Sequence, residues 1–213
     1  MGLFPNKTTG VELLTHQLAT HPASLVGSDY DCRLKIAARI FLYHGYVQAA
    51  ADTNPGSFLI QLRPEAGTST VAENWITHTT KTAAGTTPDA ETMTANEAIG
   101  DTMIECDSTT GFLAGDNLYV WNATTLTNSE WATARLITTD TSITLMDGLT
   151  RAKTTADSCA MYNDASRWVV DIDLTTTASL RVVWSHTGTA GADGHVKALA
   201  VFYDEANMQR DED

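Results

Sequence analysis

The sequence predicts an all-β protein: a β-sandwich of jelly-roll type that carries a small inserted β-barrel or meander. Two observations support this fold class. Threonine is abundant, and β-branched residues fit pleated sheets better than helices. Short runs that alternate apolar and polar residues recur along the chain, separated by segments rich in Gly, Asn, Asp and Pro, as in antiparallel sheets.

The N-terminal part, residues 1–31, is predicted to be an arm with one short helix over residues 10–19. Val11, Leu14 and Leu18 fall at helical spacing, and Thr9 can cap the first turn. So short a helix needs a surface to dock on, in the same subunit or a neighbour. We therefore expect Leu13, Leu14 and Leu18 to belong to a contact surface.

The next segments are predicted to be strands that begin the sandwich. Residues 32–48 can be written as a strand or a helix, and the regular alternation of charged and apolar residues favours the strand. Residues 57–63 and 74–81 are predicted as further strands. Residues 82–98 show no periodicity and are predicted to be a linker.

Strong alternation returns near the C-terminus, at residues 167–174, 179–185 and 195–203. The last run is apolar on both faces, which indicates a central strand. The early strands cannot bury a core alone, so we predict one sandwich from residues 32–98 and 163–205. Residues 99–162 would then be the inserted module and 206–213 an acidic tail. A chain of two successive domains is the less favoured alternative.

The module is predicted to contain four strands, at residues 102–106, 117–121, 131–137 and 142–145. Three cysteines at wide spacing, Cys32, Cys106 and Cys159, are interpreted as buried reduced thiols. A Cys106–Cys159 disulfide remains open as an alternative.

The charge balance bears on the partners. Acidic residues outnumber basic ones 26 to 13, for a formal charge of −13. Such a chain is repelled by phosphate backbones, and Arg33, Lys35 and Arg39 are interpreted as a solvated strand face. We therefore expect no nucleic-acid partner. No apolar run is long enough for a membrane helix and no apolar signal core precedes the fold, so we expect a soluble protein without a membrane partner.

No catalytic constellation, cofactor motif or metal-ligand pair is evident in the sequence. The six histidines are scattered, and a zinc site usually includes a close ligand pair. Asp171 and Asp173 share a strand face and are interpreted as its solvent side. We expect no cofactor, no metal and no enzymatic activity; a hydrolase is the least favoured class.

Aromatic residues of the module have two interpretations. Tyr119, Trp121 and Trp131 flank a polar loop and can form a platform for stacking on a sugar. They can also pack inside a module that needs large side chains, which is the favoured interpretation.

Residues 100–162 also carry a family resemblance. The start Gly-Asp-Thr at 100–102, the turn Thr-Thr-Gly-Phe-x-x-Gly-Asp at 109–116, the entry Ser-Glu-Trp at 129–131 and the end Leu-Met-Asp-Gly-Leu-Thr-Arg-Ala at 145–152 resemble a β module of tailed-bacteriophage virion proteins. In the familiar version the last stretch leads to a histidine, where this chain has Lys153.

The resemblance implies a non-enzymatic virion structural protein, and we expect a capsid decoration or cement protein. Its partners would be the major capsid protein and copies of itself, as a trimer, in virions assembled in the host cytoplasm. The alternative is a tail or fibre component, or a carbohydrate-binding module that presents Tyr119, Trp121 and Trp131 to a glycan.

Overall fold

The computed structural model describes residues 9–20, 23–47, 56–64, 75–84, 87–157, 159–186 and 193–204. Within these ranges the regular structure is β-strand, apart from the 3-10 turns η2 (Leu126–Asn128) and η3 (Thr155–Asp157). The predicted all-β class is confirmed. The predicted acidic tail, residues 206–213, lies outside the described residues.

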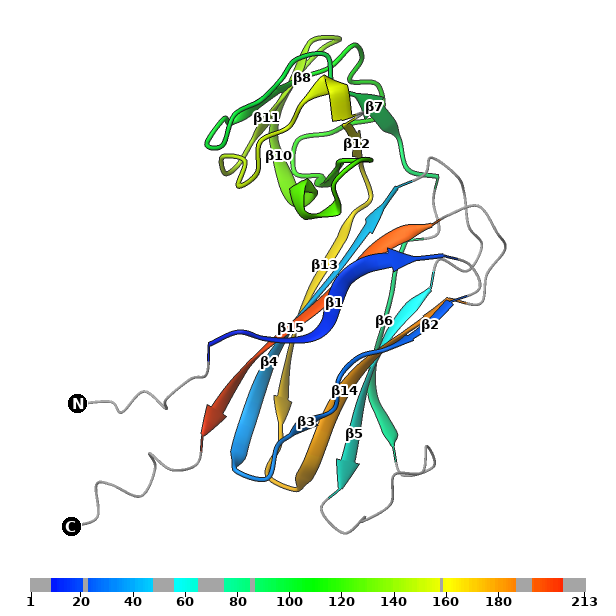
Figure 1. Ribbon diagram of the computed structural model, residues 1–213, viewed down its shortest axis with the longest axis vertical. Helices are drawn as coiled ribbons and strands as arrows, with labels where there is room; N and C mark the ends of the chain where they lie inside the picture. The colour runs from blue at the N-terminus through cyan, green and yellow to red at the C-terminus, as the bar shows by residue number, and fades with distance from the viewer. Residues whose placement is uncertain are drawn as a thin grey trace, which may run out of the picture.

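Two antiparallel sheets lie face to face and form the sandwich (Figure 1). Within the described residues, one has the strand order β1-β15-β4-β13 and the other β2-β14-β5-β6, with β3 also paired to β14. The strands are β1 (Val11–Ala19), β2 (Ala23–Val26), β3 (Tyr30–Asp31), β4 (Lys35–Tyr46), β5 (Ser57–Pro64), β6 (Ile76–Thr82), β13 (Ser166–Asp173), β14 (Thr177–His186) and β15 (Gly194–Asp204).

This strand order is that of a jelly roll. With β2 and β3 taken together as the second strand, the first sheet contains the first, eighth, third and sixth strands of the sandwich. The second sheet contains the second, seventh, fourth and fifth. Jelly rolls are built in this way from two Greek keys, and they occur in viral capsid and lectin domains.

The sandwich core follows the predicted alternation. Ala38, Ile40 and Leu42 of β4 are buried, as are Leu180, Val182 and Trp184 of β14. The strand interpretation of residues 32–48 is confirmed for Lys35–Tyr46, while Leu34 lies exposed in a turn and residue 48 lies outside the described residues. The predicted central strand at the C-terminus is β15, which lies between β1 and β4.

The helix predicted for residues 10–19 is wrong. These residues form β1, which pairs with β15, and its register shifts between Glu12 and Leu14 and again between Leu14 and Gln17. Such bulges interrupt the period of two. Leu13 and Leu14 are consequently both buried, and the apolar spacing imitates a helix. Residues 11–31 thus supply strands to the sandwich where an N-terminal arm was expected.

A third sheet forms the inserted module, with strand order β7-β12-β9-β10-β11-β8 in the described residues. All four strands predicted for the module are present. The strands are β7 (Ala90–Thr92), β8 (Met103–Glu105), β9 (Asn117–Trp121), β10 (Glu130–Thr138), β11 (Ser142–Leu145) and β12 (Ala160–Tyr162).

The linker predicted for residues 82–98 is wrong in its second half. β7 pairs with β12, Met93 forms a bridge with Cys106, and Glu97 forms one with Lys153. The paired segments are too few residues long to produce a visible alternation in the sequence.

The alternative disulfide is also wrong, because Cys32, Cys106 and Cys159 are free and buried.

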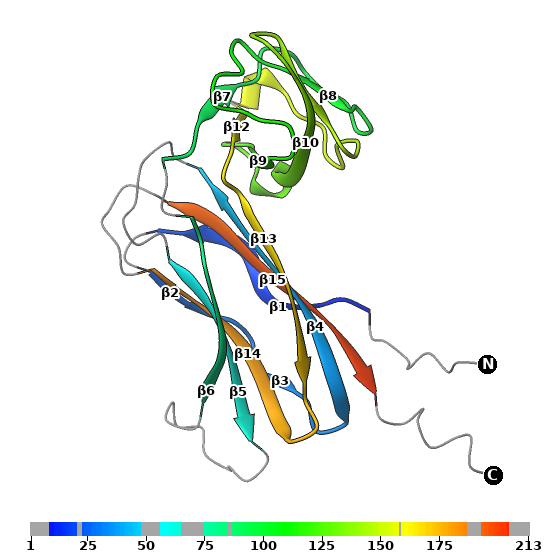
Figure 2. The ribbon, with the colours of Figure 1, turned by 180° about the vertical axis from the view of Figure 1, so that it is seen from behind.

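The module lies over one end of the sandwich, between β6 and β13 in the chain (Figures 1 and 2). Strand β13 leaves the module and runs directly into the first sheet beside β4. In the described part of the chain, no helix has the length and apolar character needed to cross a bilayer.

Candidate functional site

The junction between module and sandwich is formed by the end of β4 and by β9. Gly45 lets the two strands approach, because a Cβ atom there would lie 2.3 Å from Cγ of Tyr119. Tyr119 is fully buried against this backbone. A side chain at position 45 would therefore separate the module from the sandwich.

Tyr119 is also hydrogen-bonded to two strands of the first sheet. Its hydroxyl oxygen lies 2.6 Å from Nδ1 of His195 and 2.9 Å from Nε2 of His16. Burial, with the nearby charge of Lys197, lowers the pKa of His16 to about 4. Burial, with the nearby His16, lowers the pKa of His195 to about 4 as well. Both rings are therefore neutral at pH 7.

Two further side chains connect the module to the sandwich. Nε1 of Trp131 donates a hydrogen bond of 3.0 Å to the carbonyl oxygen of His44. Arg167, at the start of β13, donates to the Asn117 side chain at 3.0 Å, to the Ala132 carbonyl at 2.8 Å and to the Thr133 hydroxyl. The junction thus combines buried rings with directional hydrogen bonds, which fix how the module is oriented.

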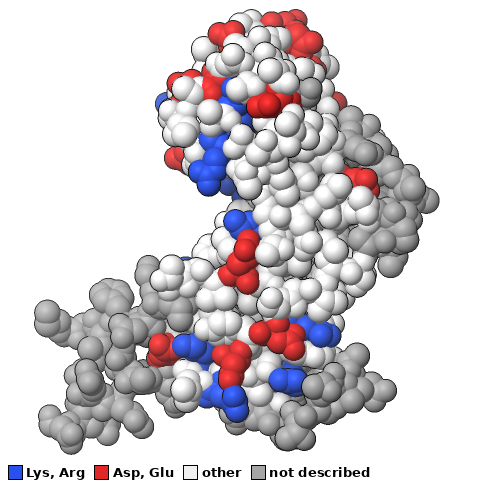
Figure 3. Space-filling model, viewed as in Figure 1, with Lys and Arg blue, Asp and Glu red and all other residues white. Residues whose placement is uncertain are grey.

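A cleft of about 470 Å³ opens at one side of this junction. Figure 3 shows the molecular surface hollowed between module and sandwich, with Lys and Arg side chains gathered around the hollow. Residues of both parts line it: His16, Tyr43, Thr127, Ser129, Glu130, Trp131, Thr150, Arg151, Arg167 and Lys197.

The cleft is cationic on a protein that is acidic as a whole. Arg151, Arg167 and Lys197 line it, against one carboxylate, Glu130. Lys197 is half-buried, and no described residue forms a hydrogen bond or ion pair with its ammonium group. The arrangement is suited to binding an anion.

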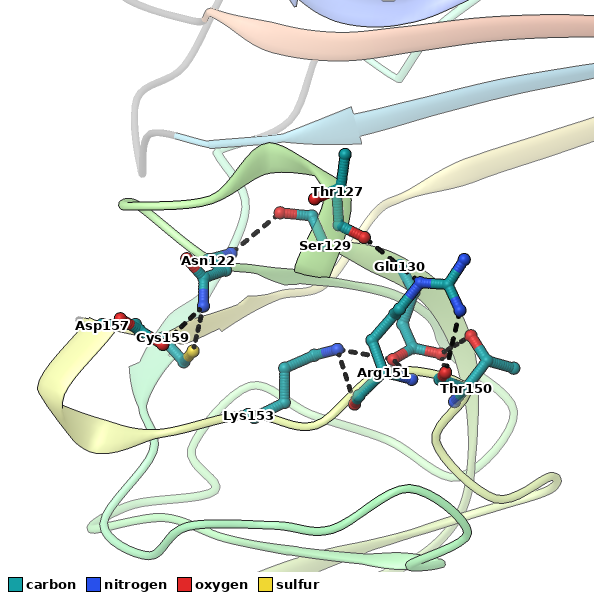
Figure 4. A network of polar contacts seen from close by, with 9 residues as sticks. All are labelled: Asn122, Thr127, Ser129, Glu130, Thr150, Arg151, Lys153, Asp157 and Cys159. Atoms are coloured by element: carbon teal, nitrogen blue, oxygen red, sulfur yellow. Dashed lines mark hydrogen bonds and ion pairs between the residues drawn. The ribbon is translucent and has the colours of Figure 1, made fainter.

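Glu130 is committed to a network inside the module (Figure 4). Its carboxylate accepts hydrogen bonds from the backbone and hydroxyl of Thr150, at 2.8 and 2.7 Å, and from the backbone of Arg151, at 3.0 Å. It is also paired with Lys153, whose side chain is completely buried. Burial opposes ionisation of Glu130, but the hydrogen bonds from Lys153 and Thr150 outweigh it and hold the pKa below its ordinary value.

This network positions the cleft wall. Lys153 also donates to the carbonyl oxygen of Arg151 at 3.1 Å, and the Arg151 guanidinium donates to the carbonyl oxygens of Thr127 and Thr150. The loop formed by residues 150–153 is therefore held by hydrogen bonds at both ends, and Arg151 stays at the edge of the cleft.

The residues predicted as a contact surface do not form one surface. Tyr119, Trp121 and Trp131 do lie together, with the rings of Tyr119 and Trp131 4.8 Å apart. Tyr119 is buried in the junction, however, and only Trp131 lines the cleft. Leu13 and Leu14 are in the sandwich core, and Leu18 is 43% exposed on β1.

Other residues of the site were not singled out from the sequence: His16, Arg167 and Lys197. They come from β1, β13 and β15, which are far apart along the chain. One signal was available, since Lys197 is the only charged residue within the otherwise apolar run 195–203.

A second hollow, of about 490 Å³, is lined by Asp31, Arg33, Leu34 and Lys35. Arg33 is paired with Asp31, and Lys35 with Asp204. Its cations are thus already neutralised by carboxylates. In the described ranges, no three His, Cys, Asp or Glu side chains are placed to hold a metal ion.

Comparison with known proteins gives little further information. No family model matches the chain, and no curated protein matches it. Among solved structures, it is similar to VP17, a capsid protein of bacteriophage P23-77, at 8% identity over 93% of this chain and 99% of that one. The TM-score is 0.17, which is too low to support a functional inference.

Proposed function

We propose that the protein is a structural component of a tailed-phage virion and serves as a decoration or cement protein of the head. The observation that carries the proposal is the architecture: a jelly roll whose strand order is that of viral capsid domains, with a β module fixed over one end. The sequence resemblance of residues 100–162 to virion modules supports it independently.

The side chains at the junction connect the module firmly to the sandwich. A protein that reinforces a shell must transmit load between its two parts. Here Tyr119, Trp131 and Arg167 connect the module to three strands of the first sheet and to the β4 backbone. Such a body can contact the major capsid protein with one part and a copy of itself with the other.

The proposal includes self-association, with a trimer as the expected form. Permanent assemblies of this kind bury roughly 2,000 Å² or more at each interface. Mass photometry of the purified protein should therefore show a trimer at micromolar concentration.

Electron microscopy of virions with and without the protein tests its place. We expect density on the head that is missing from particles lacking the protein, and restored when purified protein is added back. Density confined to the tail would favour the tail or fibre alternative. A strict monomer that does not bind heads would contradict the proposal.

A further inference from the structure

The cleft between module and sandwich concentrates positive charge. The chain has 13 Lys and Arg residues against 26 Asp and Glu, yet three of the 13 line this one hollow. The carboxylate in the cleft, Glu130, is neutralised by Lys153 and held by Thr150 and Arg151. The field inside the cleft is therefore positive, and it favours a compact anion.

Lys197 is the cation best placed to take a ligand. Its ammonium group has no hydrogen-bond or ion-pair partner among the described residues, and its side chain is half-buried. The guanidinium groups of Arg151 and Arg167 already donate hydrogen bonds to carbonyl oxygens and side chains of the module. Their positions are fixed in this way, while Lys197 remains available.

The walls of the cleft contain aromatic rings together with Thr and Ser residues. The rings of Tyr43 and Trp131 lie 5.2 Å apart at 47°, and the ring of His16 lies 5.0 Å from that of Trp131. Thr127, Ser129 and Thr150 line the same space. Its volume of about 470 Å³ lies in the range of ~300–1,000 Å³ typical of small-molecule sites.

We propose that this cleft binds an acidic saccharide, with a sugar ring against Trp131 and Tyr43 and its carboxylate facing Lys197, Arg151 and Arg167. The rings supply apolar contact for a sugar face, and the cations select a negative charge. A simple inorganic anion would leave the aromatic walls unused. A nucleic acid would bring many phosphates against a protein of charge −13.

This site is independent of the proposed role on the virion, because it rests on the cleft and not on any contact with the capsid. It also differs from the glycan platform that the sequence offers as the less favoured alternative. That platform included Tyr119, which is buried, whereas this cleft takes its cations from β13, β15 and the loop after β11.

Calorimetric titration of the full chain with sialyllactose and with trigalacturonate tests the proposal. Lactose, galactose, inorganic phosphate and a polyglutamate peptide serve as comparison ligands. We expect at least one acidic saccharide to bind at micromolar to millimolar Kd, at least about tenfold more tightly than any comparison ligand, and more weakly as salt is raised.

The variant Lys197→Gln should weaken this binding by about tenfold or more, the loss of one charge-assisted hydrogen bond. Arg151→Gln is a second variant, with an exposed side chain that can be replaced without disturbing the core. Arg135→Gln is the matched control, since Arg135 is an exposed cation on the same strand as Trp131 and does not line the cleft.

Several results would overturn the proposal. The first is that neither acidic saccharide binds. The second is that lactose or phosphate binds as tightly as the acidic saccharides, or that polyglutamate binds more tightly. The third is that Arg135→Gln weakens binding as much as Lys197→Gln does. Because capsid binding is measured separately, a negative result here leaves the proposed virion role standing.

Discussion

The hydroxyl oxygen of Tyr119 lies 2.6 Å from Nδ1 of His195, and the two residues belong to different parts of the molecule, the module and the sandwich. His16, from β1, approaches the same hydroxyl at 2.9 Å. A hydroxyl can donate one hydrogen bond while it accepts another. Tyr119 can therefore satisfy two neutral histidines that come from adjacent strands of one sheet.

Replacing Tyr119 by phenylalanine should destabilise the protein while keeping the ring. The histidine nitrogens would lose their partner in a buried place, which costs about 2 kcal/mol in free energy of unfolding. Chemical denaturation followed by tryptophan fluorescence measures this. Tyr203→Phe, on the same strand as His195, should change the free energy by less than about 0.5 kcal/mol. Equal effects of the two variants would contradict the role given to Tyr119.

Mild acid should destabilise the fold before the carboxylates titrate. Burial lowers the pKa of His16 and His195 to about 4, and burial with the nearby His186 and His195 lowers that of His44 to about 3. In the unfolded chain these histidines take up their protons near pH 6.5, so above that pH their protonation does not reduce the free energy of unfolding. It falls as the pH drops toward 4, by up to about 1.4 kcal/mol per pH unit for each histidine.

Urea denaturation at several values between pH 7.5 and 5 measures this dependence. The variant His195→Gln should reduce the slope, and His78→Gln, at an exposed position on β6, should leave it unchanged. Stability that is constant over this range would contradict the assignment of buried neutral histidines.

Gly45→Ala should disturb the junction directly. The added Cβ would lie 2.3 Å from Cγ and 2.5 Å from Cδ2 of Tyr119, so the ring or the backbone must move. Overpacking of this kind costs about 1–3 kcal/mol. Gly10→Ala is the control, because a Cβ at Gly10 meets no atom within 4 Å. Combined with Tyr119→Ala, which removes Cγ and Cδ2, the Gly45→Ala penalty should shrink, and strict additivity would show that the two residues are not in contact.

The sequence predicts the module strands and most sandwich strands because their alternation is local. Residues 117–121, for example, were predicted as a strand and form β9. β1 was missed because its two bulges place Leu13 and Leu14 side by side in the core. Local pattern does not encode where a strand shifts register, which depends on the partner strand.

The candidate site was much less predictable than the fold. Trp131 was identified as a candidate, but its neighbours His16, Arg167 and Lys197 come together only through the jelly-roll pairing of β1, β15, β4 and β13. Tyr119 shows the same limit. Its alternation in β9 is compatible with a buried or a presented ring, the buried ring being favoured, and Gly45 on another strand determines that it is buried.

Lys153 and Glu130 form the buried ion pair that supports the cleft loop, and breaking it from one side should be costly. In Lys153→Met the Glu130 carboxylate stays among Thr150 and Arg151 without its cation. The expected loss in free energy of unfolding is about 3 kcal/mol. Thermal and urea denaturation measure it.

The double variant Glu130→Gln with Lys153→Met should lose less free energy of unfolding than the sum of the two single variants. The reason is that the double variant contains no unpaired buried charge. Arg39→Gln is the control, because the Arg39–Asp171 pair is exposed to solvent and should contribute little to stability. If Lys153→Met were as mild as Arg39→Gln, the loop would be held by hydrogen bonds alone. Arg151 would then keep its place at the cleft without the ion pair.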